Sequence, residues 1–131
     1  MQVTPYLMFD GRTEEALEFY KKAVGAEVGM LMRFKEAPEE CAHAAADKVM
    51  HASFKVGDTL LMATDGNNAG KPEFKGISLS VNAGDEAQAD AMFAALGEGG
   101  QIQMPMEKTF FAKRFGMVAD KFGVSWMIIV E

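Results

Sequence analysis

The sequence predicts an α+β fold made of two tandem βαβββ modules. Two segments carry apolar residues at helical spacing, each follows a short apolar run, and each precedes stretches in which apolar and polar residues alternate. We expect module one at about 1–65, a linker rich in turn-forming residues at about 66–75, and module two at about 76–131. The 131 residues are then a single domain that repeats an element order rather than a sequence.

Module one is predicted to begin with a strand within residues 3–9 and to continue with a helix from Thr13. Thr13 is the predicted N-cap, and Gly25 is predicted to end the helix as a left-handed residue. A strand at 26–34 follows. The polar stretch 35–47 is interpreted as a loop that serves as a lid or a variable insertion.

Alternation predicts a hairpin next, with strands at 49–56 and 59–64 joined by Gly57-Asp58. Module two repeats the order, and Asp120 to Gly123 form a turn in which Gly123 takes a positive φ. Its predicted elements are a strand at 77–81, a helix at 85–96, and strands at 101–107, 115–119 and 124–130.

Charge and cysteine content narrow the function classes. The chain has 19 acidic and 13 basic residues, a formal charge of −6, which argues against nucleic acid as a partner. A single cysteine excludes an intrachain disulfide, and residues 1–9 lack the pattern of a signal peptide, so we expect a cytoplasmic location. No apolar run is long enough to cross a membrane.

Several motifs carry a resemblance to a known family. They are Tyr6 to Gly11, Glu15 to Tyr20, Gly25, Met50-His51-Ala52, Leu61 to Asp65, Thr109 to Ala112, Phe115-Gly116, Asp120 to Val124 and Trp126 to Ile128. Through these motifs the chain resembles the vicinal-oxygen-chelate superfamily of glyoxalases, bleomycin-resistance proteins and dioxygenases, and within it the PhnB-like branch. The resemblance implies two curved sheets that form a cup, commonly completed across a homodimer.

Enzymes of this superfamily usually hold a divalent metal through His and Glu side chains on four strands. The resemblance places these positions near residues 4–6, at Leu61 or Met62, at Gly76 or Ser78, and at Met127. Hard or borderline divalent ions prefer oxygen and imidazole ligands, and these positions lack carboxylates and imidazoles. We therefore expect no catalytic metal and no cofactor. Cys41 and His43, beside Glu39 and Glu40, are an alternative zinc or copper site or a solvated loop.

The cup lining follows from alternation. His51 and Ser53 are predicted to face the cup, opposite Ala52 and Phe54, and His51 is the candidate catalytic residue. For each methionine or phenylalanine, an ordinary place in the core is the alternative. The candidate ligand-binding residues are Tyr6, Met8, Ser53, Met62, Ser78, Phe111, Arg114 and Met127.

One binding role rests on a cluster of aromatic and cationic residues. Lys113-Arg114 follows Phe110-Phe111 and could present charge and ring faces to an anionic or planar ligand. The alternative is a solvated strand edge. Relatives often have Phe-Trp-Gly where this chain has Phe110-Phe111-Ala112, so a role of that tryptophan transfers only loosely.

Three functions remain open. The first is a metal-independent homodimer that binds a small molecule. The second is a metal-dependent lyase, dioxygenase or transferase, and the third is a metal-free enzyme in which His51 is a general base near Ser53 or Tyr6. Whether the chain is an enzyme stays open. The sequence has no glycine-rich dinucleotide motif, P-loop or nucleophile elbow, so it does not support nucleotide use or methyl transfer.

Overall fold

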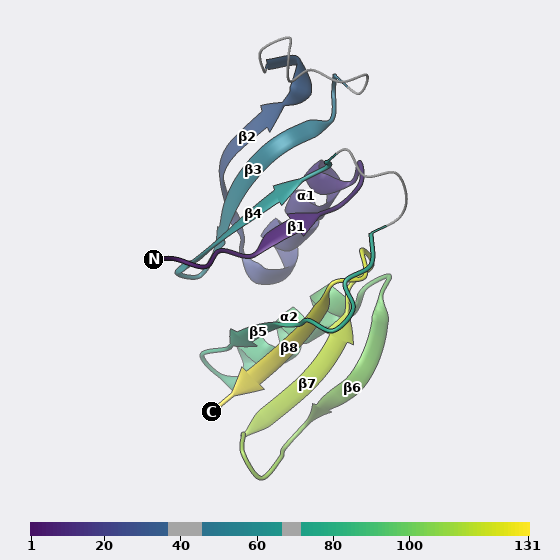
Figure 1. Cartoon of the computed structure of the whole chain (residues 1–131). Coiled ribbons are helices and arrows are strands. Elements are labelled where there is room, and N and C mark those ends of the chain that lie inside the picture. Colours follow the sequence, from purple (N-terminus) through teal and green to yellow (C-terminus); the bar gives the residue numbers. More distant parts are fainter. Residues whose placement is uncertain (37–45, 67–71) are drawn as a thin grey trace. The chain divides into compact units, whose positions relative to one another are not determined.

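The computed structural model describes residues 1–36, 46–66 and 72–131, and most of the predicted loop at 35–47 lies outside these ranges. The chain divides into two compact units, residues 1–72 and 73–131. Each unit contains one four-stranded sheet and one α-helix (Figure 1). The predicted α+β class with two repeated βαβββ units is confirmed.

The first sheet has the strand order β1-β4-β3-β2. Strands β1 and β4 are parallel, whereas β3 pairs with β4 and with β2 in the antiparallel sense. Glycine 57, at φ +58°, allows the tight predicted turn between β3 and β4. The elements are β1 (Tyr6–Met8), α1 (Thr13–Val24), β2 (Glu27–Arg33), the 3-10 helix η1 (Phe34–Glu36), β3 (Val49–Val56) and β4 (Thr59–Thr64).

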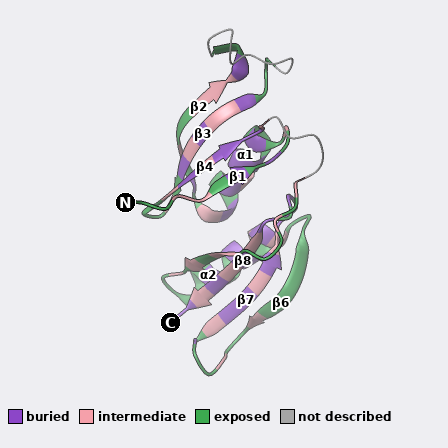
Figure 2. Ribbon diagram, viewed as in Figure 1, coloured by how far each residue is buried: buried purple, intermediate pink, exposed green. Residues whose placement is uncertain are grey.

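Helix α1 covers one face of this sheet, and aromatic packing fixes it there. The rings of Tyr20 and Phe54 stack with centroids 6.1 Å apart, and both side chains are almost fully buried. Burial of each such side chain stabilises the fold by about 2 kcal/mol. Leu7, Leu61 and the alanines of β3 and β4 fill the same side, so the opposite face of the sheet is left without a covering helix in this unit (Figure 2).

A buried carboxylate joins α1 to the sheet. Asp65 follows β4, is 4% exposed, and accepts hydrogen bonds from the backbone N–H groups of Gly11, Thr13 and Val49 at 2.8 to 2.9 Å. The prediction that Thr13 is the N-cap is wrong, because Arg12 occupies that position and Thr13 is the first helical residue. The cap is supplied by Asp65, which is distant in sequence, rather than by a local hydroxyl.

The second sheet repeats the topology with the order β5-β8-β7-β6, in which β5 and β8 are parallel. The predicted strand at 77–81 begins later than expected, and the other strands and the helix lie within a residue or so of their predicted bounds. The elements are β5 (Leu79–Asn82), α2 (Glu86–Gly97), β6 (Gln101–Glu107), β7 (Arg114–Ala119) and β8 (Ser125–Val130).

The core of the second unit is built around Trp126, which is 1% exposed. Its indole Nε1 donates to Asp120, whose carboxylate also accepts the N–H groups of Phe122 and Val124. Gly123 has φ +91°, as predicted for this turn. Helix α2 packs so close to β7 that a Cβ at Gly116 would lie only 2.9 Å from the ring of Phe93, so glycine is needed at this position.

Membrane insertion through a helix finds no support in the described residues. None of their helices combines the length and the apolar character that a membrane span requires.

Asp65 is predicted to be essential for the stability of the first unit. Asp65→Ala should lower the free energy of unfolding by about 3 kcal/mol, because three buried N–H groups lose their acceptor. Urea unfolding followed by circular dichroism measures the effect. Asp58→Ala, in the exposed β3–β4 turn, is the control and should change stability by less than about 0.5 kcal/mol. Equal midpoints for the two variants would contradict this role.

Candidate functional site

The open face of the first sheet carries the predicted site residues of module one. Register places Tyr6, Met62, Ser53 and Met30 in one row across all four strands, from β1 to β2. Side chains of register partners lie on the same face of a sheet. Tyr6 is 44% exposed, and Ser53 and Met62 are half-buried. These groups therefore line one accessible surface.

Tyr6 and His51 form a polar pair on this face. A hydrogen bond of 2.8 Å joins the Tyr6 hydroxyl to Nδ1 of His51, and the two rings are tilted by 51° with centroids 5.7 Å apart. The bond connects β1 to β3 across the intervening strand β4. Within the described part of the chain, Nε2 of His51 has no hydrogen-bond partner. The arrangement fixes the imidazole ring and leaves this nitrogen available to a ligand.

The open face of the second sheet carries two further predicted residues, Met127 in a central row and Ser78 in the lining of a cavity beside it. Register places Ser80, Met127, Met117 and Met104 in one row from β5 to β6. A shallow cavity of about 410 Å³ lies beside this row. Its lining is mixed, with hydroxyl, amide and thioether groups, and consists of Gly76, Ile77, Ser78, Gln103, Met104, Met117 and Ser125.

The aromatic and cationic cluster is divided by the sheet. The Phe111 ring packs edge-on against Phe115 at 5.1 Å and against the fully exposed Phe110 at 5.2 Å. Arg114 instead pairs with Asp90 on α2 at 2.6 Å, and this hydrogen bond raises the pKa of the arginine. Neighbouring residues of a strand point to opposite faces. Arg114 thus lies on the helix side, and Phe111 contacts a residue of the open face.

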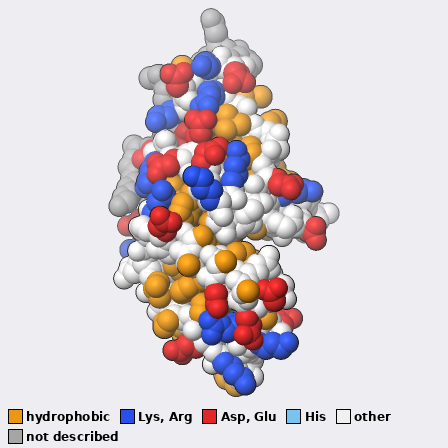
Figure 3. Space-filling model, turned by 180° about the vertical axis from the view of Figure 1, so that it is seen from behind, with side chains coloured by type: hydrophobic (Ala, Val, Ile, Leu, Met, Phe, Trp, Pro, Cys, Tyr) orange, Lys and Arg blue, Asp and Glu red, His pale blue; other side chains and the backbone are white. Residues whose placement is uncertain are grey.

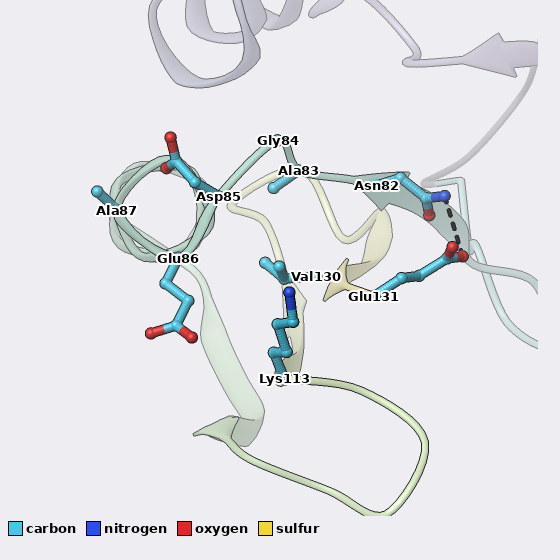
Figure 4. Close-up of a pocket in the computed structure, with 9 residues that line it drawn as sticks. All are labelled: Asn82, Ala83, Gly84, Asp85, Glu86, Ala87, Lys113, Val130 and Glu131. Atoms are coloured by element: carbon cyan, nitrogen blue, oxygen red, sulfur yellow. Dashed lines mark hydrogen bonds between the residues drawn. The ribbon is translucent and has the colours of Figure 1, made fainter.

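Sequence reasoning missed a larger cavity, of about 580 Å³, at the N-terminus of α2. Figure 4 shows the Lys113 side chain rising beside Val130, and Asn82 donates a hydrogen bond of 3.3 Å to Glu131. Asp85 caps the helix by accepting the N–H of Gln88. Lys113 lines this cavity together with the carboxylates of Asp85, Glu86 and Glu131.

The residues at the expected ligand positions do not fit a divalent metal. Tyr6, Met62 and Met127 offer a phenol and two thioethers, whereas such ions need carboxylates or imidazoles that converge. Among the described residues, no three His, Cys, Asp or Glu side chains are grouped to hold an ion. The candidate pair Cys41 and His43 lies outside these residues. The described side chains at the expected positions therefore provide no ligand set for a metal-dependent step.

Comparison with known proteins identifies the family. Residues 1–129 match the model of a family described as 3-demethylubiquinone-9 3-methyltransferase. The chain belongs to this family. Protein YjdN of Escherichia coli (strain K12) is 31% identical over 140 residues, which cover 99% of this chain and 95% of that protein.

Two solved structures are similar over the whole chain. Protein PA1353 from Pseudomonas aeruginosa is 40% identical, with a TM-score of 0.89, and the match covers 100% of this chain and 98% of that one. A protein from Bacillus cereus, described as a putative 3-demethylubiquinone-9 3-methyltransferase and PhnB protein, is 31% identical with a TM-score of 0.85, and the match covers all of both chains. The resemblance to the PhnB-like branch is confirmed.

More distant structures confirm the superfamily fold. A glyoxalase-related enzyme from Fulvimarina pelagi has a TM-score of 0.67 at 19% identity, with 100% of this chain and 88% of that one covered. The fosfomycin resistance protein FosX from Mesorhizobium loti has a TM-score of 0.63 at 12% identity, with 98% and 90% covered. At these identities the likeness shows the vicinal-oxygen-chelate fold and nothing of the chemistry.

The family's description names a methyl transfer, which requires a methyl-donor cofactor. A glycine-rich loop that binds a cofactor would be expected between a strand and the helix that follows it. This chain has two such turns, one before α1 and one before α2. Side chains already occupy the helix ends there, Asp65 at the first and Asp85 at the second. The residues of these turns do not fit such a cofactor, and the geometry supports no methyl-transfer step.

The Tyr6 hydroxyl is predicted to fix the His51 ring. Tyr6→Phe should change the nitrogen chemical shifts of His51 and lower stability by less than about 1 kcal/mol, because the bond is exposed. Nitrogen-15 NMR of the imidazoles measures the first effect. Met8→Leu is the matched control, since Met8 is also 44% exposed on β1 but has no phenol. Unchanged His51 shifts in Tyr6→Phe would show that the pair is absent in solution.

Proposed function

We propose that this chain is a small-molecule-binding protein that acts as a homodimer and needs no divalent metal. The observation that carries the proposal is the open face of the first sheet. There the hydrogen-bonded pair Tyr6–His51 stands beside Ser53 and Met62 without a carboxylate in the row. Such a surface binds through hydrogen bonds and apolar contact rather than through metal coordination.

The chemistry of the lining favours a planar or amphipathic ligand. Phenol, imidazole and hydroxyl groups supply directional donors and acceptors. Methionine side chains are unbranched and polarizable, so Met8 and Met62 adapt to the apolar part of a ligand. The hydroxyl of Ser78 and the thioether of Met127 would make the corresponding contacts on the second sheet, with Phe111 as a stacking ring.

Exposed apolar side chains support the homodimer. Tyr6, Met8 and Met30 are 44 to 45% exposed on the open face of the first unit, and the second unit exposes Ile102 and Phe110. Figure 3 shows hydrophobic side chains reaching the surface among the charged ones. Apolar groups exposed in this way are common where another surface binds, and a C2 dimer is the most frequent arrangement.

The cytoplasmic location stays a prediction.

The first test is metal content. Protein purified without an affinity tag should contain less than about a tenth of an ion of nickel, manganese, zinc or iron per chain by mass spectrometry, because the expected ligand positions lack carboxylates and imidazoles. Calorimetric titration with nickel, manganese, zinc and iron(II) should show no binding at these positions. Near-stoichiometric metal that is lost in Met62→Leu or His51→Ala would overturn metal independence.

A second function is favoured by one observation, the 2.8 Å bond between Tyr6 and His51. In a metal-free enzyme, His51 would act as the general base through Nε2, and Tyr6 would orient the ring. Ser53 lies on the same strand two residues away and shares its face. Binding and catalysis by this pair differ in whether the ligand is altered.

The two functions give different results for His51→Ala. Planar amphipathic compounds that raise the melting temperature of the protein are incubated with it and analysed by mass spectrometry. For a binding protein, we expect unchanged compound and at least about fivefold weaker binding by His51→Ala, since a hydrogen bond of about 1 kcal/mol is lost.

For an enzyme, the compound would be converted, and His51→Ala would abolish conversion while binding persists. Lys22→Ala, on the exposed side of α1, is the control and should match the parent protein in both assays. Conversion that His51→Ala leaves intact would remove His51 from the candidate site.

A further inference from the structure

Three methionines stand side by side on the open face of the second sheet. Met104 on β6 pairs with Met117 on β7, and Met117 pairs with Met127 on β8. Register partners on neighbouring strands of a regular ladder lie about 4.5 to 5.5 Å apart at their Cα atoms and point to the same face. The register of β6 shifts on both sides of Met104, but Met104 and Met117 line the same cavity, which places both side chains on the open face. The three thioethers are therefore neighbours in space, although 23 positions in the chain separate the outer two residues.

These methionines are not core residues of their unit. The alternate residues Val118, Trp126 and Ile128 point to the helix side and are 0 to 1% exposed. Met104 is 43% exposed, and Met117 and Met127 are half-buried. Their sulfur atoms thus belong to a face that a ligand can reach from solvent.

The side chains of this row are soft or uncharged ligands. It continues on β5 with Ser80, and the adjoining cavity adds the uncharged Gln103, Ser78 and Ser125. No carboxylate or imidazole belongs to the row or the cavity lining. Thioethers bind hard ions poorly and select soft ones, above all copper(I).

The geometry suits one soft ion. A metal–sulfur bond of about 2.3 Å puts the sulfurs of a trigonal site about 4 Å apart. Met117 is the central member, and the unbranched side chains of Met104 and Met127 need only lean towards it, which their three rotatable bonds permit. The equivalent row of the first sheet interrupts the thioethers, because Ser53 separates Met62 from Met30.

We propose that Met104, Met117 and Met127 form a three-thioether site for a soft monovalent cation, copper(I). The site lies within the second unit and is independent of the pair Tyr6–His51. It uses no hard donor, so it is compatible with the proposed function, which dispenses with divalent metals.

The test titrates the full chain with silver(I) as a redox-inert probe and then with copper(I) in competition with a colorimetric chelator under anaerobic conditions. Cys41 is replaced by serine in every protein, because a thiolate would bind these ions and obscure the thioethers. Methionine carbon-13 methyl NMR reports on each thioether. One equivalent of silver(I) should shift the methyl signals of Met104, Met117 and Met127 together.

Substitution of the central thioether, Met117, tests whether the row binds copper(I). Met117→Leu keeps the apolar volume and should weaken copper(I) binding at least about tenfold, since one of three ligands is lost. Met106→Leu is the matched control, because Met106 is half-buried like Met117 but its sulfur lies beside Gly116, outside the row of three. It should bind like the parent. Absence of one-to-one binding, or equal affinity in Met117→Leu and Met106→Leu, would overturn the site.

Discussion

The arrangement of each unit depends on a buried carboxylate that gathers N–H donors. Asp65 binds three backbone amides that belong to the turn before α1, to α1 itself and to β3, and it thereby positions the helix on one face of the first sheet. Asp120 does the same for the turn between β7 and β8 and adds the indole of Trp126. A charged group is costly to bury unless its acceptor capacity is used, and here three donors satisfy each carboxylate.

As a consequence, the two faces of each sheet differ in what they carry. Because the helix covers one face, the aliphatic and aromatic core gathers there, with Tyr20 against Phe54 and Trp126 beside α2. The other face is released from packing the unit's own core. It carries the groups with chemistry, the phenol and imidazole of Tyr6 and His51 on one sheet and a row of thioethers on the other.

Local physical chemistry predicted much of this from the sequence, and partners distant in sequence account for what it missed. The turns at Gly57 and Gly123 and the left-handed cap at Gly25 follow from residues adjacent in the chain. The cap of α1 does not, because its acceptor is 52 positions from Thr13. Alternation likewise predicted that His51 lies on the open face of its strand. The hydrogen bond of His51 to Tyr6 and the ion pair between Arg114 and Asp90 have no signal in the sequence, because the partners are distant in the chain.

The ligands proposed for this chain depend on its side chains rather than on its backbone. The backbone has the vicinal-oxygen-chelate fold. Its TM-score is above 0.6 against both FosX and the glyoxalase-related enzyme. In those folds the strands fix where side chains converge, and the side chains fix what is held there. At positions where the resemblance implies metal ligands, this chain has the phenol of Tyr6 and the thioethers of Met62 and Met127, which are neither imidazoles nor carboxylates. Such side chains give a surface that is polarizable and edged with hydroxyls, in keeping with the small-molecule site and the soft-ion site proposed above.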